Sequence, residues 1–171
     1  ATAETADLDC TDLEPVGLVS LAESVRPTAA DAVTGFARAG VRVVMATGDH
    51  AATAAAVARS VGLTADRVGT GALDPSSLEP MDLIARVDPA TKVALVDAHQ
   101  ERGRVVAMMG DGVNDAPALE RADVGIAVGG QGGTDVARSV ADVVITDGDL
   151  GTILVAVREG RRIYRNLTTA T

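Results

Sequence analysis

The sequence predicts an α/β fold in which a parallel sheet carries helices on both faces. Short apolar runs alternate along the chain with helical patterns of about 10–15 residues, an order that favours parallel strands joined by helical crossovers. The 171 residues are 47% hydrophobic, which suits one domain with a buried core. Phe36 and Tyr164 are the only aromatic side chains, so Val, Leu, Ile and Ala must fill that core.

Apolar runs and boundary residues define the predicted elements. Residues 1–14 are small, polar and acidic, and we expect a disordered end or the tail of a preceding domain. The strands are predicted at 16–21, 41–46, 104–109, 124–128 and 143–146. The helices are predicted at 27–39, 51–61, 76–85, 89–102, 115–121, 134–140 and 150–167.

Helix boundaries rest on residues with known positional preferences. The first helix has Pro27 at its first position and Gly40 just beyond its end. The second is rich in Ala and ends before Gly62. The helix at 89–102 has Asp88 as its N-cap and Gly103 as its stop signal.

Charge and cysteine content exclude several classes of protein. The chain has 15 Lys and Arg against 24 Asp and Glu, a net charge of −9, which argues against a broad nucleic-acid surface. The single Cys10 excludes an internal disulfide and a cysteine-based zinc cluster. We see neither a signal peptide nor an apolar run of about 20 residues, and we expect a soluble, cytosolic segment.

The first candidate site follows the predicted strand 41–46. Thr47, Gly48 and Asp49 lead there into a helix, and ligands of parallel α/β sheets bind at the carboxyl ends of strands. A hydroxyl, a residue without Cβ and the amides of a new helix favour an anion. The alternative is that Thr47 or Asp49 only caps the helix and Gly48 only turns the chain.

The second candidate site follows the predicted strand 104–109. Asp111, Asn114 and Asp115 lie within five residues between glycines, and such hard oxygen ligands suit Mg²⁺. Alternatively Asn114 is a helix N-cap and Asp115 belongs to the first turn, although this leaves Asp111 unexplained.

Lys92 is the only lysine, placed in the first turn of the helix 89–102, where a cation opposes the helix dipole. From there it could reach a phosphate held among Thr47, Asp49 and Asp111 and balance the carboxylates together with Mg²⁺. The alternative is a solvated surface side chain.

Other conspicuous residues have simpler interpretations. The glycine-rich segment 129–134 matches neither common phosphate-loop motif, so we interpret it as a flexible connection. His50 and His99 lack partners at metal-ligand spacing, and Met108 and Met109 are predicted to lie in the core.

Five motifs stand in a recognisable order. They are MATGD at 45–49, DPATK at 88–92, GDGVNDAPAL at 110–119, ADVGIAVG at 122–129 and GTDVA at 133–137. Together they resemble the phosphorylation domain of P-type cation-transporting ATPases, in the haloacid dehalogenase-like superfamily. The resemblance runs from about residue 16 to residue 166, and the string at 110–119 is highly specific. It implies a Rossmann-like sheet.

The resemblance also implies catalytic roles for matching residues. Thr47 and Gly48 would bind the phosphoryl oxygens, and Asp49 would support that loop and the closed state. Lys92 would neutralise the phosphoryl charge, and Asn114 would bind phosphate beside it.

Metal, substrate and partners follow from the same resemblance. Asp111 and Asp115 would hold Mg²⁺, and ATP would be the substrate of the parent protein. The partners would be the nucleotide-binding, actuator and transmembrane domains of a pump, at the cytoplasmic face of the cell membrane. Residues 1–14 would end the nucleotide-binding domain, 15–149 would be the distal phosphorylation domain, and 150–171 a stalk-like helix.

The family's nucleophile motif, D-K-T-G-T, does not occur in these 171 residues. A second departure is LAESVRP at 21–27, where the family often has a D-P-P-R-P-like stretch, so a role for Glu23 is not carried over. We therefore expect a fragment that supplies the metal site and phosphate shell without the phosphorylated Asp. The alternatives are a non-catalytic regulatory remnant or a free-standing phosphatase.

The resemblance places the nucleophile strand between the strands 41–46 and 104–109, so its absence would leave two unpaired edges. We expect those strands to close on each other, or the segment 16–21, a second copy or another chain to fill the gap.

Overall fold

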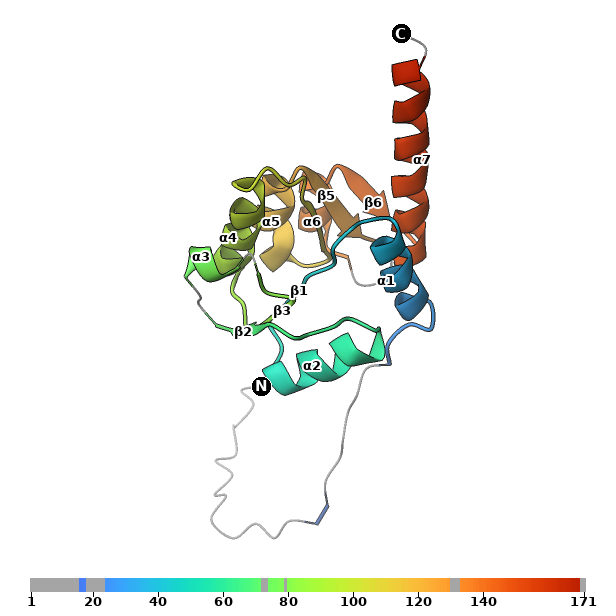
Figure 1. Cartoon of the computed structure of the whole chain (residues 1–171). Helices are drawn as coiled ribbons and strands as arrows, with labels where there is room; N and C mark the ends of the chain where they lie inside the picture. The colour runs from blue at the N-terminus through green and yellow to red at the C-terminus, as the bar shows by residue number, and fades with distance from the viewer. Residues whose placement is uncertain (1–15, 18–23, 72–73, 79, 130–132, 170–171) are drawn as a thin grey trace, which may run out of the picture.

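The computed structural model describes residues 16–17, 24–71, 74–78, 80–129 and 133–169. Their strands form two parallel three-stranded sheets rather than one continuous sheet (Figure 1). The first has the order β1-β3-β2 and the second the order β4-β5-β6. The strands are β1 (Met45–Thr47), β2 (Val68–Thr70), β3 (Leu83–Ala85), β4 (Ala107–Gly110), β5 (Val124–Val128) and β6 (Val143–Ile145).

Helices connect the strands in the alternation that the sequence predicts. They are α1 (Ala29–Arg38), α2 (Ala51–Ser60), α3 (Pro75–Leu78), α4 (Pro89–Gln100), α5 (Ala116–Arg121), α6 (Asp135–Val140) and α7 (Leu150–Thr169). A single 3₁₀ turn, η2 (Val113–Asp115), leads into α5. The α/β fold with helices on both faces is therefore confirmed.

Helix α2 covers one face of the first sheet, and α3 and α4 cover the other. Ala54 and Ala58 of α2 pack on Leu83 and Ala85 of β3. On the opposite face, Ile84 lies in a cluster with side chains of α3 and α4. Because β3 is central and covered on both faces, all three of its residues are buried.

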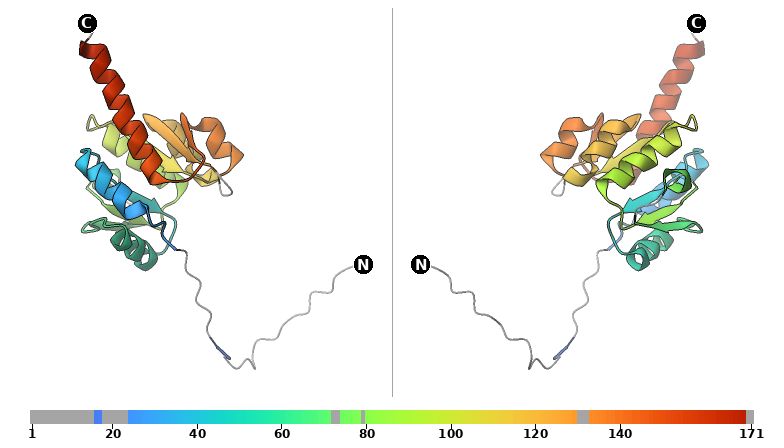
Figure 2. Two further views of the ribbon diagram at one scale, coloured as in Figure 1. Left: turned by 90° about the vertical axis from the view of Figure 1, so that its right-hand side faces the viewer. Right: turned by 90° about the vertical axis from the view of Figure 1, so that its left-hand side faces the viewer.

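The second sheet is likewise covered on both faces. Phe36 of α1 and Leu154 of α7 pack with Ile126 of β5 on one side. Leu119 of α5 packs with Ala127 of β5 and with α6 on the other side. Helix α7 packs on α1 through its first turns, and its second half projects beyond the rest of the molecule (Figure 2).

The two sheets meet through helices. Arg121 of α5 forms an ion pair with Asp97 of α4, with Nε 2.5 Å from Oδ1. Gln100 of α4 also donates to the main-chain carbonyl of Arg121, at 3.3 Å. These contacts link α4, which follows the first sheet, to α5, which belongs to the second.

The expectation that the predicted strands 41–46 and 104–109, which correspond to β1 and β4, pair with each other is wrong. Each is an edge strand of its own sheet, hydrogen-bonded to β3 and to β5 respectively. Residues 18–21 of the proposed filling segment lie outside the described residues, and 16–17 form no strand.

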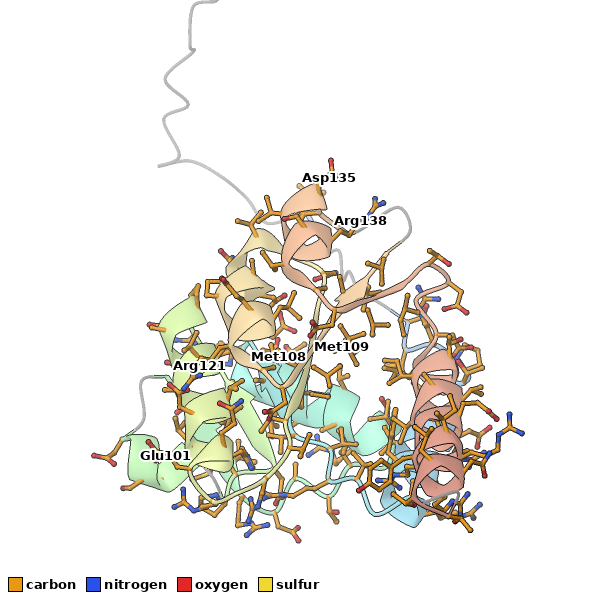
Figure 3. The ribbon with its side chains drawn as sticks, turned by 90° about the horizontal axis from the view of Figure 1, so that it is seen from above. Glu101, Met108, Met109, Arg121, Asp135 and Arg138 are labelled. Atoms are coloured by element: carbon orange, nitrogen blue, oxygen red, sulfur yellow. The ribbon has the colours of Figure 1, made fainter. Side chains whose placement is uncertain are left out.

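Met109 is not in the core as predicted, because it lies on the edge strand β4. It is 41% exposed, although its neighbour Ile126 on β5 is buried, because β5 is the only strand of the described residues that pairs with β4. Met108 points to the opposite face and packs against the cluster that contains Leu119. Both methionines are labelled in Figure 3, which views the molecule from above.

The predicted helix 76–85 is also wrong. Its first part is α3, which ends at Leu78, and its last part is the strand β3. A run of three buried apolar residues is too short for its hydrophobic pattern to distinguish a helix from a strand. The strand β2 was not predicted at all, and β1 and β4 begin four and three residues later than expected.

Within the described residues, no helix combines the length and the apolar character needed to cross a bilayer.

Candidate functional site

The first predicted site lies at the carboxyl end of β1. The main-chain N–H of Asp49 donates to Oγ1 of Thr47 at 3.1 Å, which closes a tight turn. Two amides that follow β3 hold the same turn from the side. The Val87 N–H donates to the Thr47 carbonyl at 3.1 Å, and the Arg86 N–H donates to the Asp49 carbonyl at 3.0 Å. This loop is therefore anchored largely by main-chain groups.

The N-terminus of α2 is open beside this turn. His50 occupies the N-cap position and makes no side-chain capping hydrogen bond. The alternative in which Thr47 or Asp49 caps the helix is thus not what the structure shows. Gly48 is exposed, and an added Cβ there would meet no atom within 4 Å. Exposed amides at a helix N-terminus can accept an anion.

The second predicted site lies at the carboxyl end of β4. The chain turns at Gly112 into η2, and the Asp115 N–H donates to the Gly112 carbonyl at 3.1 Å. In return the Gly112 N–H donates to Oδ2 of Asp115 at 3.3 Å. Asn114 lies inside this turn and is not the helix N-cap.

Lys92 reaches this turn from α4. Its Nζ lies 2.5 Å from Oδ1 of Asp115, and the two side chains are only 13% and 11% exposed. Lys92 is therefore not a solvated surface residue. A charge pair so well removed from water interacts more strongly than an exposed pair. The motifs at 88–92 and 110–119 meet through this contact.

Asp88 fixes the end of α4 that carries Lys92. Its Oδ1 accepts a hydrogen bond from the Thr91 N–H at 2.7 Å, as the N-cap prediction requires. Hydrogen bonds from the Thr91 side chain and then from its main chain lower the pKa of Asp88 below its usual range. The cap thus remains charged in neutral solution and favours the helix dipole.

Asp111 and Asn114 are exposed on the same turn, whereas Asp115 is buried. The donor set fits Mg²⁺, because an exposed carboxylate next to a second carboxylate is what this ion uses with water and phosphate. No three His, Cys, Asp or Glu side chains among the described residues gather closely enough to hold a metal by themselves. A Mg²⁺ ion here would complete its coordination with water and phosphate oxygens.

The structure brings some of the predicted site residues together and leaves others apart. Lys92, Asp111 and Asp115 are brought to one turn. The loop 47–49 ends a strand of the other sheet, and within the described residues no hydrogen bond or ion pair joins it to the loop 110–115.

Thr134 also lies beside this site, although the sequence alone assigns it no site role and predicts it at the junction of the glycine-rich connection and the helix 134–140. It makes two hydrogen bonds to the Asp111 carbonyl. The signal was a threonine directly before a helix with an acidic first residue, which is typical of an N-cap. Of the rest of that connection, 130–132 lie outside the described residues.

Comparison with known proteins agrees with the motifs. Residues 1–123 match the family model of the haloacid dehalogenase-like hydrolases. The chain is 48% identical over 166 residues to the probable cation-transporting ATPase F of Mycobacterium bovis, an alignment that covers 89% of this chain. It is 46% identical to the cation-transporting ATPase pma1 of Synechocystis, over 91% of this chain. In both cases it spans 18% of the relative's length.

Solved structures confirm the fold. A zinc-transporting PIB-type ATPase in an E2·Pi state matches 86% of this chain and 21% of its own, with a TM-score of 0.70 and 31% identity. The catalytic domain of the CPx-ATPase CopB-B matches 75% of this chain and 44% of its own, with a TM-score of 0.61 and 27% identity. The chain therefore belongs to the haloacid dehalogenase-like hydrolases and, within them, is similar to the phosphorylation domain of P-type cation-transporting ATPases.

Proposed function

We propose that this chain is the distal part of the phosphorylation domain of an ATP-driven cation pump. Its role is to hold phosphate and Mg²⁺ around an aspartyl-phosphate whose Asp lies on another segment. The observation that carries the proposal is the contact of Lys92 with Asp115, which brings a cation from α4 to the acidic turn after β4. If the Lys92–Asp115 pair only stabilised the fold, it would give no reason for a second carboxylate, Asp111, to lie exposed on the same turn.

Phosphoryl transfer needs positioning and charge compensation more than covalent chemistry. In this proposal Lys92 meets the negative charge of a phosphoryl group, and its ion pair with Asp115 keeps its ammonium in position. Thr47 and Gly48 offer a hydroxyl and close main-chain approach, Asn114 offers an amide, and Asp49 supports the first loop. When bound at Asp111 and Asp115, Mg²⁺ would neutralise phosphoryl oxygens.

The phosphorylated Asp is proposed to come from outside the 171 residues, because they contain no D-K-T-G-T motif. The relatives are named as cation-transporting ATPases, and we extend ATP hydrolysis and cation transport to the parent of this chain. Its partners would be nucleotide-binding, actuator and transmembrane domains, with this domain at the cytoplasmic face of the membrane. Residues 1–14 would close the nucleotide-binding domain, and 150–171 would form a stalk.

The unpaired outer edges of β1 and β4 suit this arrangement. Among the described residues β1 pairs only with β3 and β4 only with β5, so each has an outer edge to which a further parallel strand could add. Without it, we expect the chain to self-associate through these edges, detectable as concentration-dependent mass in light scattering. A monomer at all concentrations with slowly exchanging β1 and β4 amides would contradict this.

Amide chemical shifts can test the site itself. We expect Mg²⁺ to shift the amides of residues 110–115, and inorganic phosphate with Mg²⁺ to shift those of 47–49 as well. Asp111→Asn should remove the Mg²⁺ response, and Lys92→Met should remove the phosphate response. Arg121→Met, which breaks an exposed ion pair on α5, is the matched control. Equal responses in all four proteins would refute the proposal.

Labelled ATP provides a complementary test. The chain incubated with ATP and Mg²⁺ should form no acid-stable, hydroxylamine-sensitive label, since general electrostatics without a nucleophile cannot make an acyl phosphate. Label on any Asp of this chain would show that the proposed division of roles is wrong.

A further inference from the structure

The connection between β5 and α6 ends in a pair of contacts with the acidic turn. The Thr134 N–H donates to the main-chain carbonyl of Asp111 at 2.9 Å. The Thr134 hydroxyl donates to the same oxygen at 3.2 Å. One carbonyl thus accepts two hydrogen bonds from a residue that is 23 positions away in sequence.

Thr134 is itself held in place. It is the N-cap of α6, and its Oγ1 accepts a hydrogen bond from the Ala137 N–H at 3.3 Å. The preceding Gly133 lies so close to the end of β5 that an added Cβ would collide with the Val128 carbonyl and approach Gly129 Cα to 3.2 Å. Figure 3 labels Asp135 at the start of α6.

The other side of the acidic turn is fixed by different residues. Asp115 binds the Gly112 N–H with one carboxylate oxygen and Lys92 with the other. Asp111 therefore lies between two anchors, with its main chain held by Thr134 and its side chain exposed. Holding the carbonyl restrains the main chain of Asp111, and the main-chain conformation limits the rotamers open to its carboxylate.

We propose that Thr134 is a positioning residue for the metal-binding carboxylate of Asp111. This inference rests on the proposed function, because it assumes that Asp111 binds a divalent cation. Thr134 does not touch the metal. It reduces the number of orientations that the Asp111 carboxylate can adopt, so that less freedom is lost when the ion binds.

The test compares Mn²⁺ binding to the folded chain and its variants, followed by paramagnetic broadening of the amides of residues 110–115. Thr134→Val retains the shape of the side chain and removes its hydroxyl, and we expect about tenfold weaker binding, as for other groups that orient metal ligands. Thr134→Ser retains the hydroxyl and should restore wild-type binding. Thr152→Val removes a threonine hydroxyl that donates to Asp147 at 2.7 Å, far from this turn in sequence, and should change nothing.

A second measurement needs no variant. Metal binding at Asp111 and the hydrogen bonds to its carbonyl should stabilise each other, so saturating Mg²⁺ should slow, several-fold, the hydrogen exchange of the Thr134 amide, which donates to that carbonyl. The Gly151 amide, which donates to Asp149 at 2.8 Å, serves as the reference and should not respond.

The outcomes separate the two proposals. If Asp111→Asn abolishes the broadening but Thr134→Val binds like wild type, the positioning role is refuted and the metal site stands. If Thr134→Ser binds as weakly as Thr134→Val, or if Mg²⁺ leaves Thr134 exchange unchanged, the positioning role is likewise refuted. If the wild-type amides at 110–115 are not broadened selectively, the metal site fails and this inference falls with it.

Discussion

The loop after β1 and the loop after β4 both end a parallel strand, but they are held by different kinds of group. The first is closed by main-chain amides of Arg86 and Val87, which any sequence would supply. The second depends on two remote residues, through the side chain of Lys92 and through both the side chain and the amide of Thr134. Substitutions in the first loop should therefore change the stability of the fold little, whereas substitutions in the second loop or at its two partners should lower it.

The largest expected effect comes from breaking the Lys92–Asp115 pair. Lys92→Met retains the apolar stem and leaves a largely buried carboxylate without its cation, which should lower the free energy of unfolding by about 3 kcal/mol. Urea denaturation measures this loss. Arg121→Met is the control, because its pair with Asp97 is 56% and 36% exposed and should contribute under about 1 kcal/mol. Equal losses would mean that the second loop has no special dependence on Lys92.

Two glycine substitutions compare the loops directly. A Cβ at Gly110 would lie 2.6 Å from Cγ and 2.7 Å from Oδ2 of Asp115, so Gly110→Ala must displace that carboxylate. Overpacking of this kind typically costs about 1–3 kcal/mol of unfolding free energy. Gly48→Ala meets no atom within 4 Å and should leave stability within about 1 kcal/mol of wild type.

Ligand binding by the same two variants tests the comparison of the two loops further. If the loop after β1 binds phosphate, Gly48→Ala should weaken the phosphate response while the protein stays fully folded. Gly110→Ala should weaken the Mg²⁺ response together with stability. A Gly48→Ala protein that loses stability as much as Gly110→Ala would remove the contrast between the loops.

Local signals in the sequence were sufficient for most of the helices. Asp88 is the N-cap of α4 as predicted, because capping depends on residues within one turn. The strand β3 could not be assigned in the same way. Its three apolar residues are buried by α2 on one face and by α3 and α4 on the other, and neither contact is visible in a local pattern.

The candidate site shows the same limit. Lys92 and Asp115 were both selected, but their contact depends on how α4 packs against the second sheet. The sequence predicts no site role for Thr134, because its partner, the Asp111 carbonyl, is a main-chain group that carries no sequence signal. Met109 is predicted in the core because the sequence shows that the residue is apolar and not that β4 is an edge strand of its sheet.

Lowering the pH should weaken a charged contact of the first sheet, which is made by Asp82. This is the smallest of the three effects on stability that we expect. Asp82 lies before β3, with Oδ1 3.0 Å from Nη2 of Arg42 and 3.1 Å from Nη2 of Arg67. The hydrogen bond from Arg67, and then that from Arg42, holds the pKa of Asp82 below its usual range against the opposing effect of burial.

Because the folded-state pKa is depressed, the charged carboxylate stabilises the fold at every pH above the unfolded value of about 4. That contribution should disappear as the pH falls from about 4 through the lower folded-state pKa. Its size should stay under about 1 kcal/mol, since the arginines are 37% and 55% exposed and water screens the pair. Urea denaturation of Asp82→Asn should show a loss at pH 6 that vanishes near pH 2. Asp66→Asn, at an exposed carboxylate, is the control and should leave the free energy of unfolding at pH 6 within about 0.5 kcal/mol of wild type. A loss in Asp82→Asn that is the same at both pH values would mean that shape and not charge makes Asp82 an anchor of the first sheet.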